Sequence, residues 1–317
     1  MANITFSNLE GDLRLSQMIS SEIALLLKDN ASLRNSGYIK YAGSINGMGS
    51  DTIRVRKVGL MGYDSFNAPA TYEDDAISET SLSDGHADCV VSRFQLSYKM
   101  SDLAGITSFG NSPYEIDPFN LAASIAASYD TLFAELTAAA ALGSTGSVGT
   151  SGASMSVSTF FAAIYNLEQA TGGAGSIAAG ASGPFYACLH PKALSELQAS
   201  LRSEQNNIVS QMVATEEMIQ AKGQGYAGKL FGVDVYRSGH IDTDGTDYNS
   251  FMADAGGLMY ADGVPSIVGA AETMQMDKVT IELSRVPERA LSVITGHAYL
   301  GLAVLDDNRL VKMLSVD

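Results

Sequence analysis

Hydrophobic and polar residues alternate in two stretches of the first third of the chain, at residues 52–58 and 90–100. In the first stretch, Ile53 and Val55 alternate with arginines. A period of two places the apolar side chains on one face of a strand and the polar ones on the other. We therefore predict two strands that pair with each other as an extended two-stranded loop.

The connection between these predicted strands, residues 62–88, has neither a helical nor a strand period. Its 27 residues make it much longer than the usual connection in a compact domain. It contains seven acidic residues and no Lys or Arg. We expect an arm that reaches a different subunit, and a disordered acidic loop is the alternative.

The base of this predicted arm is basic, whereas its connection is acidic, which favours contacts between neighbouring copies of the chain. The candidate contact residues are Arg54, Arg56 and Lys57 at the base and Glu73, Asp74, Asp75 and Glu79 in the connection. Arg34 and Lys40 are further basic candidates. Exposed ion pairs are individually weak, so only the sum of these contacts is expected to matter.

Helical periodicity predicts one long helix and several shorter ones. The long helix, 117–142, starts with Asp117 as N-cap and Pro118 at its first position, and one apolar face continues for about six turns. The shorter helices are predicted at 16–28, 157–170, 191–202 and 208–222. Short strands are predicted at 184–189, 230–236, 251–260 and 279–283, with a longer apolar strand at 291–305.

Composition is typical of a folded protein, because 46% of the residues are hydrophobic and 17% are charged. The most apolar stretch, 121–142, contains Asp130 and Glu135, so a helix spanning a membrane is not expected. The N-terminus lacks the basic cluster and apolar run of a secretory signal. We interpret the chain as a soluble protein made in a cytoplasm.

Motifs for catalysis or cofactor binding are misplaced. Gly223, Gly225 and Gly228 have the spacing of a dinucleotide-binding loop, but a helix pattern precedes them and a strand pattern follows, which reverses the required order. Three aspartates around Gly245 lack the glycine position and the glutamate of an EF-hand, so a polar turn is favoured over a cation site. The four histidines are scattered, and no nucleophile elbow is present. We expect no enzyme, cofactor or metal.

Cysteine content and net charge restrict the environment and the partners. Cys89 and Cys188 are too few for a disulfide framework, and we expect both to be reduced and buried. The formal charge of −16 argues against binding nucleic-acid phosphates through a basic surface. Any association with DNA should therefore be enclosure.

Two local sequences resemble those of a known family. Residues 184–194, PFYACLHPKAL, end a strand in His-Pro and begin a helix, and residues 228–236, GKLFGVDVY, have the pattern Gly-x-x-hydrophobic-Gly-Val-x-Val. Together with the order of parts along the chain, they resemble the tailed-bacteriophage major capsid proteins. That fold is shared with encapsulin shells and the floor of herpesvirus capsids.

The resemblance implies an α+β fold with five parts. These are an N-terminal arm (1–49), an extended two-stranded loop (50–105), a peripheral domain with a long spine helix (106–182), an axial domain (183–275) and a C-terminal return to the peripheral domain (276–317). It implies a structural protein of the virion that assembles as pentamers and hexamers into an icosahedral head around double-stranded DNA.

The implied partners are other copies of the chain, a portal protein and a decoration protein. Only about fifty residues precede the loop, so a separate scaffolding protein is expected in place of a long scaffolding segment. The lysine, asparagine and glutamate that cross-link subunits in some members cannot be placed on this sequence. An encapsulin-type compartment is the alternative with the same fold, and an α/β enzyme is a more distant one.

Overall fold

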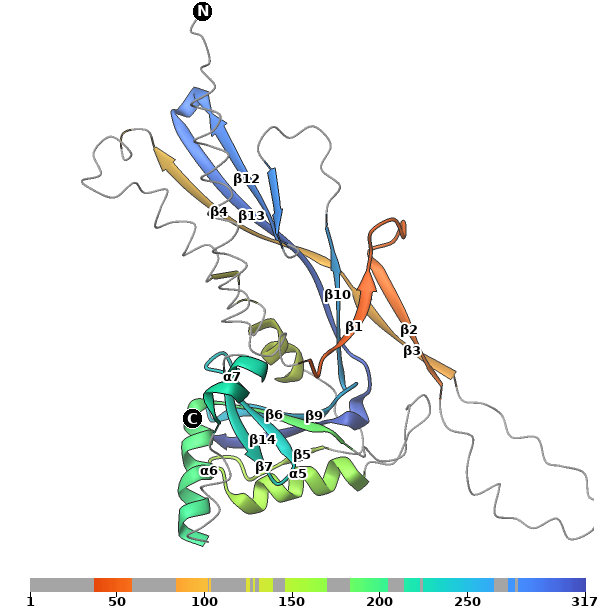
Figure 1. Ribbon diagram of the computed structural model, residues 1–317, viewed down its shortest axis with the longest axis vertical. Helices are drawn as coiled ribbons and strands as arrows, with labels where there is room; N and C mark the ends of the chain where they lie inside the picture. The colour runs from red at the N-terminus through yellow and green to blue at the C-terminus, as the bar shows by residue number, and fades with distance from the viewer. Residues whose placement is uncertain are drawn as a thin grey trace, which may run out of the picture.

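The computed structural model describes residues 37–58, 84–101, 103, 124–125, 128, 131–138, 146–169, 183–204, 214–222, 225–264, 273–276 and 279–317. In this part of the chain the strands form two six-stranded sheets and one two-stranded sheet (Figure 1). The predicted helix at 16–28, the start of the predicted long helix and the first part of 208–222 lie outside the described residues.

The first sheet is built around β13 (Leu291–Val304), the long apolar strand that the sequence predicts. β4 (Ser92–Ser101) and β12 (Val279–Val286) pair with the N-terminal part of β13, and β10 (Leu258–Gly263) pairs with its C-terminal part. β1 (Lys40–Ser44) extends the sheet from β10, and β11 (Thr273–Met276) extends it from β12.

The second sheet has the strand order β5 (Ser147–Val148), β14 (Leu310–Val316), β9 (Asp247–Asp254), β6 (Phe185–Leu189), β8 (Val233–Arg237) and β7 (Tyr226–Leu230). Its helices are α5 (Val157–Gln169), α6 (Pro191–Glu204) and α7 (Glu216–Lys222). All five residues of β6 are buried, as expected for a strand at the centre of a covered sheet. The predicted helices at 157–170 and 191–202 and the strand at 184–189 are confirmed.

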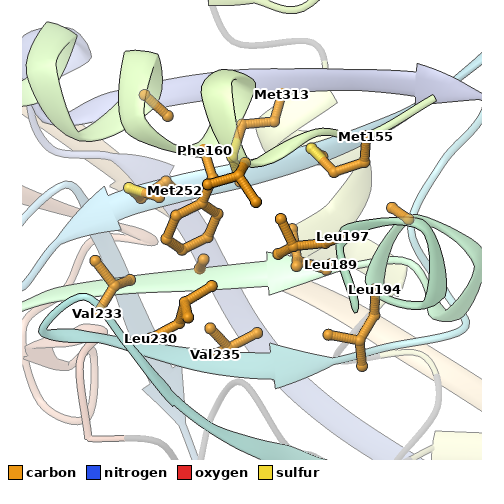
Figure 2. Packing of buried hydrophobic residues seen from close by; sticks show 14 of the residues in the cluster. Met155, Phe160, Leu189, Leu194, Leu197, Leu230, Val233, Val235, Met252 and Met313 are labelled. Carbon is orange, nitrogen blue, oxygen red and sulfur yellow. The ribbon is translucent and has the colours of Figure 1, made fainter. Parts of the chain in front are cut away.

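One face of the second sheet packs against α5 and α6. Phe160 of α5 lies among Leu230, Val233 and Met252 of the sheet (Figure 2). Leu197 of α6 is also fully buried in this cluster. Apolar residues of α5 at helical spacing, Val157, Phe160, Ala163 and Leu167, make up its buried face.

The opposite face of the second sheet is covered by aromatic residues from distant parts of the chain. Residues 131–138 of the predicted long helix are helical, and Phe133 from this segment is fully buried there. Tyr38, immediately before β1, stacks on Tyr186 of β6 with ring centroids 5.0 Å apart. The two faces of the sheet therefore have separate cores.

The predicted pairing of residues 52–58 with residues 90–100 is wrong. β2 (Thr52–Val58) pairs with β3 (Asp84–Val90), and β4 pairs with β13 near the C-terminus. Residues 84–88, predicted to belong to a connection without periodicity, are therefore part of a strand. The inward residues of β3 are the small Ala87 and Cys89, which make a weak apolar pattern.

Two stretches that are each predicted to be a single strand contain parts of two different strands. Residues 251–260 divide between β9 and β10, which lie in different sheets, because Gly256 and Gly257 interrupt the run. Residues 230–236 cover the end of β7 and most of β8, joined by a turn at Phe231 and Gly232 with positive φ angles of 50° and 87°.

The predicted domain boundary at residues 275–276 stays a prediction, and the two large sheets do not divide there. β10, inside the predicted axial domain, lies in the first sheet. β14, inside the predicted C-terminal return, lies in the second. Each of the two large sheets therefore contains strands from both the predicted axial domain and the predicted C-terminal return.

The chain crosses β13 at Gly301 as it passes from β3 to β4. A Cβ atom on Gly301 would lie 2.6 Å from the carbonyl oxygen of Val90 and 3.0 Å from Sγ of Cys89. The amide of Val91 donates a hydrogen bond to the Asp51 carbonyl at 2.8 Å, which holds the crossing segment to the start of β2. This close approach requires glycine.

We predict that Gly301→Ala lowers the free energy of unfolding by about 1 to 3 kcal/mol, because the added methyl overlaps the Val90 backbone. Urea unfolding of the isolated subunit measures the change. Gly239→Ala is the matched control, since a Cβ atom there meets nothing within 4 Å. Equal stability of both variants would contradict this account of the crossing.

Candidate assembly surfaces

The β2–β3 hairpin has one apolar and one polar face, as the alternation in β2 predicts. Ile53 and Cys89 are buried and pack with Met259 and Ala261 of β10. Arg54 projects on the other face, with 64% of its side chain exposed. The apolar face thus attaches the hairpin to the first sheet and leaves the basic face open.

Arg54 has a carboxylate partner within its own chain. Its Nε and Nη2 atoms donate to the two carboxylate oxygens of Asp88, at 2.7 and 2.9 Å. The hydrogen bonds from Arg54 lower the pKa of Asp88, and those to Asp88 raise the pKa of Arg54. Both groups are solvent-screened, so the pair orients the guanidinium more than it stabilises the hairpin.

The structure places only part of the predicted contact set. Arg56 is exposed on β2, and Lys40 is exposed at the start of β1. Lys57 lies on β2, but its side chain is outside the described residues. Arg34, Glu73, Asp74, Asp75 and Glu79 also lie outside them. Contact between the basic and acidic members therefore stays a prediction.

Charge is distributed unevenly over the chain. Strands β1 to β4 together contain six Lys or Arg and two Asp, a formal charge of +4. The whole chain has a formal charge of −16, so the remainder has −20. The strands at the hairpin are therefore a basic region on an otherwise strongly acidic protein.

An apolar strip on β4 is exposed although it faces the long helix. Phe94, Leu96 and Tyr98 are 36%, 42% and 42% exposed. Together with Ile125 and Leu132 of the long-helix segment, the first two line a hollow of about 160 Å³. The alternation at residues 90–100 predicts that these side chains share a face, but it gives no sign that the face is incompletely covered.

A second exposed apolar surface, the aromatic patch, lies on the outer side of α5. Phe161 and Tyr165 are 46% and 62% exposed, and Phe161 packs against Phe231 of the β7–β8 turn with ring centroids 4.4 Å apart. No charged residue occurs from Val157 to Leu167. Exposed aromatic surface of this kind is typical of protein interfaces. The signal for this patch in the sequence is weak, because it consists of only two aromatic residues outside the apolar face of α5.

The aspartates of the 242–247 segment form a polar turn. Oδ1 of Asp244 accepts hydrogen bonds from the amides of Thr246 and Asp247, at 2.9 and 2.8 Å. The Asp247 carboxylate accepts from the Gly152 amide at 2.8 Å. Their oxygens thus serve the backbone, and no cluster of three or more His, Cys, Asp or Glu side chains suited to a metal occurs among the described residues.

The cysteines, His190 and the helices bear on the remaining expectations about chemistry. Cys89 and Cys188 do not form a disulfide, and both are buried, as predicted. His190 joins β6 to α6, and its ring stacks on the ring of Tyr248 with centroids 3.6 Å apart. Burial lowers the pKa of His190. None of the helices in the described ranges is long and apolar enough to cross a membrane.

The segment before β1 is fixed to the second sheet by a polar cluster around Asp234 of β8. This carboxylate, 4% exposed, accepts hydrogen bonds from Nζ of Lys222 at 2.8 Å, from Tyr226 at 3.2 Å and from Tyr38. Burial acts to raise the pKa of Asp234, but the hydrogen bonds from Lys222 and Tyr38 outweigh it and hold the pKa below its ordinary value.

Comparison with known proteins gives a fold and no sequence relative. No protein-family model matches the chain, and no curated protein matches it in sequence. The capsid of Ralstonia phage GP4 matches with a TM-score of 0.57 and 9% identity, over 88% of this chain and 86% of that chain. The capsid of cyanophage P-SCSP1u matches with a TM-score of 0.56 and 11% identity, over 87% and 85%.

An encapsulin complex from Synechococcus elongatus matches equally well, with a TM-score of 0.56 and 13% identity, over 84% of this chain and 82% of that chain. At these identities the likeness concerns the fold. The chain has the α+β fold of phage capsid proteins, as the sequence resemblance predicted.

We predict that Asp234→Asn reduces the dependence of stability on pH. Because the folded pKa lies below the ordinary value of 3.8, the stabilisation by this carboxylate is present above that value and is lost as pH falls through the folded pKa. The free energy of unfolding should therefore fall less between pH 6 and pH 2 in the variant than in the parent. Asp51→Asn, an exposed position, is the control and should keep the parental dependence.

Proposed function

We propose that this chain is the major capsid protein of a tailed bacteriophage, a structural protein without catalytic activity. The observation that supports this most strongly is the fold shared with phage capsid subunits over most of both chains. In the proposal, copies assemble in the host bacterial cytoplasm as pentamers and hexamers. These close into an icosahedral head that encloses double-stranded DNA.

The distribution of charge and apolar surface supports self-assembly. The basic region of strands β1 to β4, on a chain with a formal charge of −16, is complementary to the acidic remainder of a neighbouring copy. The apolar strip and the aromatic patch supply surface that neighbouring copies would cover. Each contact can be modest, because many contacts around every subunit make a closed shell cooperative.

The proposed partners follow from the same function. A portal protein, a separate scaffolding protein and a decoration protein complete the proposed assembly. The genome is enclosed without sequence-specific binding, since a strongly basic inner wall would hold the DNA and resist its release. The net negative charge of the chain is consistent with that requirement.

An encapsulin-type compartment is the second candidate function. The observation in its favour is that the Synechococcus elongatus encapsulin complex matches this fold as well as the phage capsids do. The two candidates differ in what the shell encloses, which is a genome in one case and cargo proteins in the other. The contents of particles isolated from the native source would separate them.

Electron microscopy of the purified chain tests the proposal directly. We expect closed shells, and particles from the native source should contain nuclease-protected double-stranded DNA. Particles filled with protein would favour the encapsulin. A chain that remains a small oligomer in gel filtration, with and without its scaffolding protein, would contradict both functions.

We predict that replacing Glu73, Asp74 and Asp75 with Gln, Asn and Asn slows shell assembly at low salt, because these carboxylates then no longer attract Arg54 and Arg56 of a neighbour. The difference should shrink near 1 M salt, where the screening length is about 3 Å. Light scattering during assembly at several ionic strengths measures the effect.

The matched control removes the same charge elsewhere, with Glu216→Gln, Glu217→Gln and Asp242→Asn at exposed positions of the second-sheet region. This control should assemble as fast as the parent. The electrostatic account of the acidic segment is wrong if the first triple variant assembles like the parent at every ionic strength.

A further inference from the structure

The two large sheets share a pair of strands that pass together from one sheet to the other. β9 continues into β10 and β13 continues into β14 (Figure 1). In the second sheet Ala253 pairs with Leu310, and in the first sheet Leu258 pairs with Val304. The antiparallel ladder is therefore interrupted only at residues 254–257 of one strand and 305–309 of the other.

Arg309 bridges the two strands inside this interruption. Its Nη1 atom donates to the Asp254 carboxylate at 2.7 Å, and its Nε atom lies 3.7 Å from the Asp306 carboxylate. The three side chains are only 18%, 7% and 4% exposed, in the order Arg309, Asp254 and Asp306. At this burial the ionic attraction is weakly screened, and a planar guanidinium holds its partners in a defined direction.

The backbone around Arg309 is closely packed. The amide of Leu305 donates to the Gly257 carbonyl at 2.8 Å, which ties the two strands together beside the ion pair. A Cβ atom on Gly257 would lie 2.8 Å from the Arg309 carbonyl oxygen, and one on Gly256 would lie 3.4 Å from its Nη1 atom. The two strands are therefore packed closely at the interruption.

A ribbon of two strands is least stiff where its ladder of hydrogen bonds is broken. At that point the backbone alone sets the direction in which one sheet continues into the other, unless side chains bridge the strands. Arg309 is such a bridge, because it sits on one strand and holds Asp254 on the other. Loss of the guanidinium would leave a buried carboxylate unpaired and the bend without its cross-strand contact.

We propose that Arg309 is a positioning residue that fixes the angle between the two sheets and, through that angle, the curvature of the assembled shell. The second part rests on the proposed function. A subunit with a variable angle meets its neighbours at variable angles, and these errors add around a closed ring. Arg309 thus determines particle size through the shape of its own subunit.

The test compares Arg309→Gln and Arg309→Lys in the full chain with Arg202→Gln, the same change at an exposed position of α6. Electron microscopy measures the particle diameters, and small-angle X-ray scattering measures the shape of the isolated subunit. We expect Arg309→Gln to lower the fraction of particles with the parental diameter about tenfold, the change expected when a charge-assisted hydrogen bond is lost. Arg309→Lys should recover part of it, and Arg202→Gln should assemble like the parent.

Asp254→Asn supplies a second, milder variant that removes the charge on the opposite strand and keeps an oxygen for the Ala255 amide. It carries the test if Arg309→Gln does not fold, as judged by circular dichroism. Parental particle diameters for whichever variant folds would overturn the inference and leave the proposed function intact. If the parent forms no shells, the proposed function fails, and the inference then depends on scattering: an unchanged subunit shape in the variant overturns it.

Discussion

Strands β9 and β14 of one sheet continue as β10 and β13 of the other, so neither sheet can move without acting on a ladder that both share. Other contacts are arranged around this shared ribbon. α5 and α6 cover one face of the second sheet, and the segment before β1 is fixed to the other face at Tyr38. The hairpin β2–β3 packs on β10 through Ile53 and Cys89. The shared ribbon therefore fixes the cores of the two large sheets relative to each other.

The distribution of charge over the molecule does not follow its division into hydrophobic cores. The basic strands at the hairpin are held in place by apolar contacts, while Lys40 and Arg56 are exposed and Arg54 meets a carboxylate of the same chain. An internal pair of this kind orients a charge without neutralising the region around it. The position of the basic strands is thus set by apolar packing, and their positive charge remains able to attract other molecules.

The sequence predicts elements well where one period is clear and long. α5, β6 and β13 follow from helical spacing, a short buried run and a long apolar run. The pattern of β3 is weak because its inward residues, Ala87 and Cys89, are small, and the apolar runs of β9 and β10 look like one strand because only a glycine pair separates them. These are local ambiguities that composition alone does not resolve.

Pairing was a harder problem than element type. The strand pattern nearest to β4 in the sequence is that of β2, but the partner of β4 is near the opposite end of the chain, and nothing local in either sequence identifies the other. For the candidate surfaces, alternation predicts which residues share a face. It cannot predict whether another element covers that face, so the exposure of Phe94, Leu96 and Tyr98 required the structure.

The pairing of β4 with β13 has a consequence for the chain during its synthesis. Ser101 pairs with Leu291, so 190 residues must be translated before the partner of β4 exists. At ordinary elongation rates this takes roughly 10 to 40 s. Throughout that interval the apolar side chains of β4 are exposed to other nascent chains on the same messenger. The yield of native subunits therefore depends on the speed of the ribosome as well as on the stability of the finished fold.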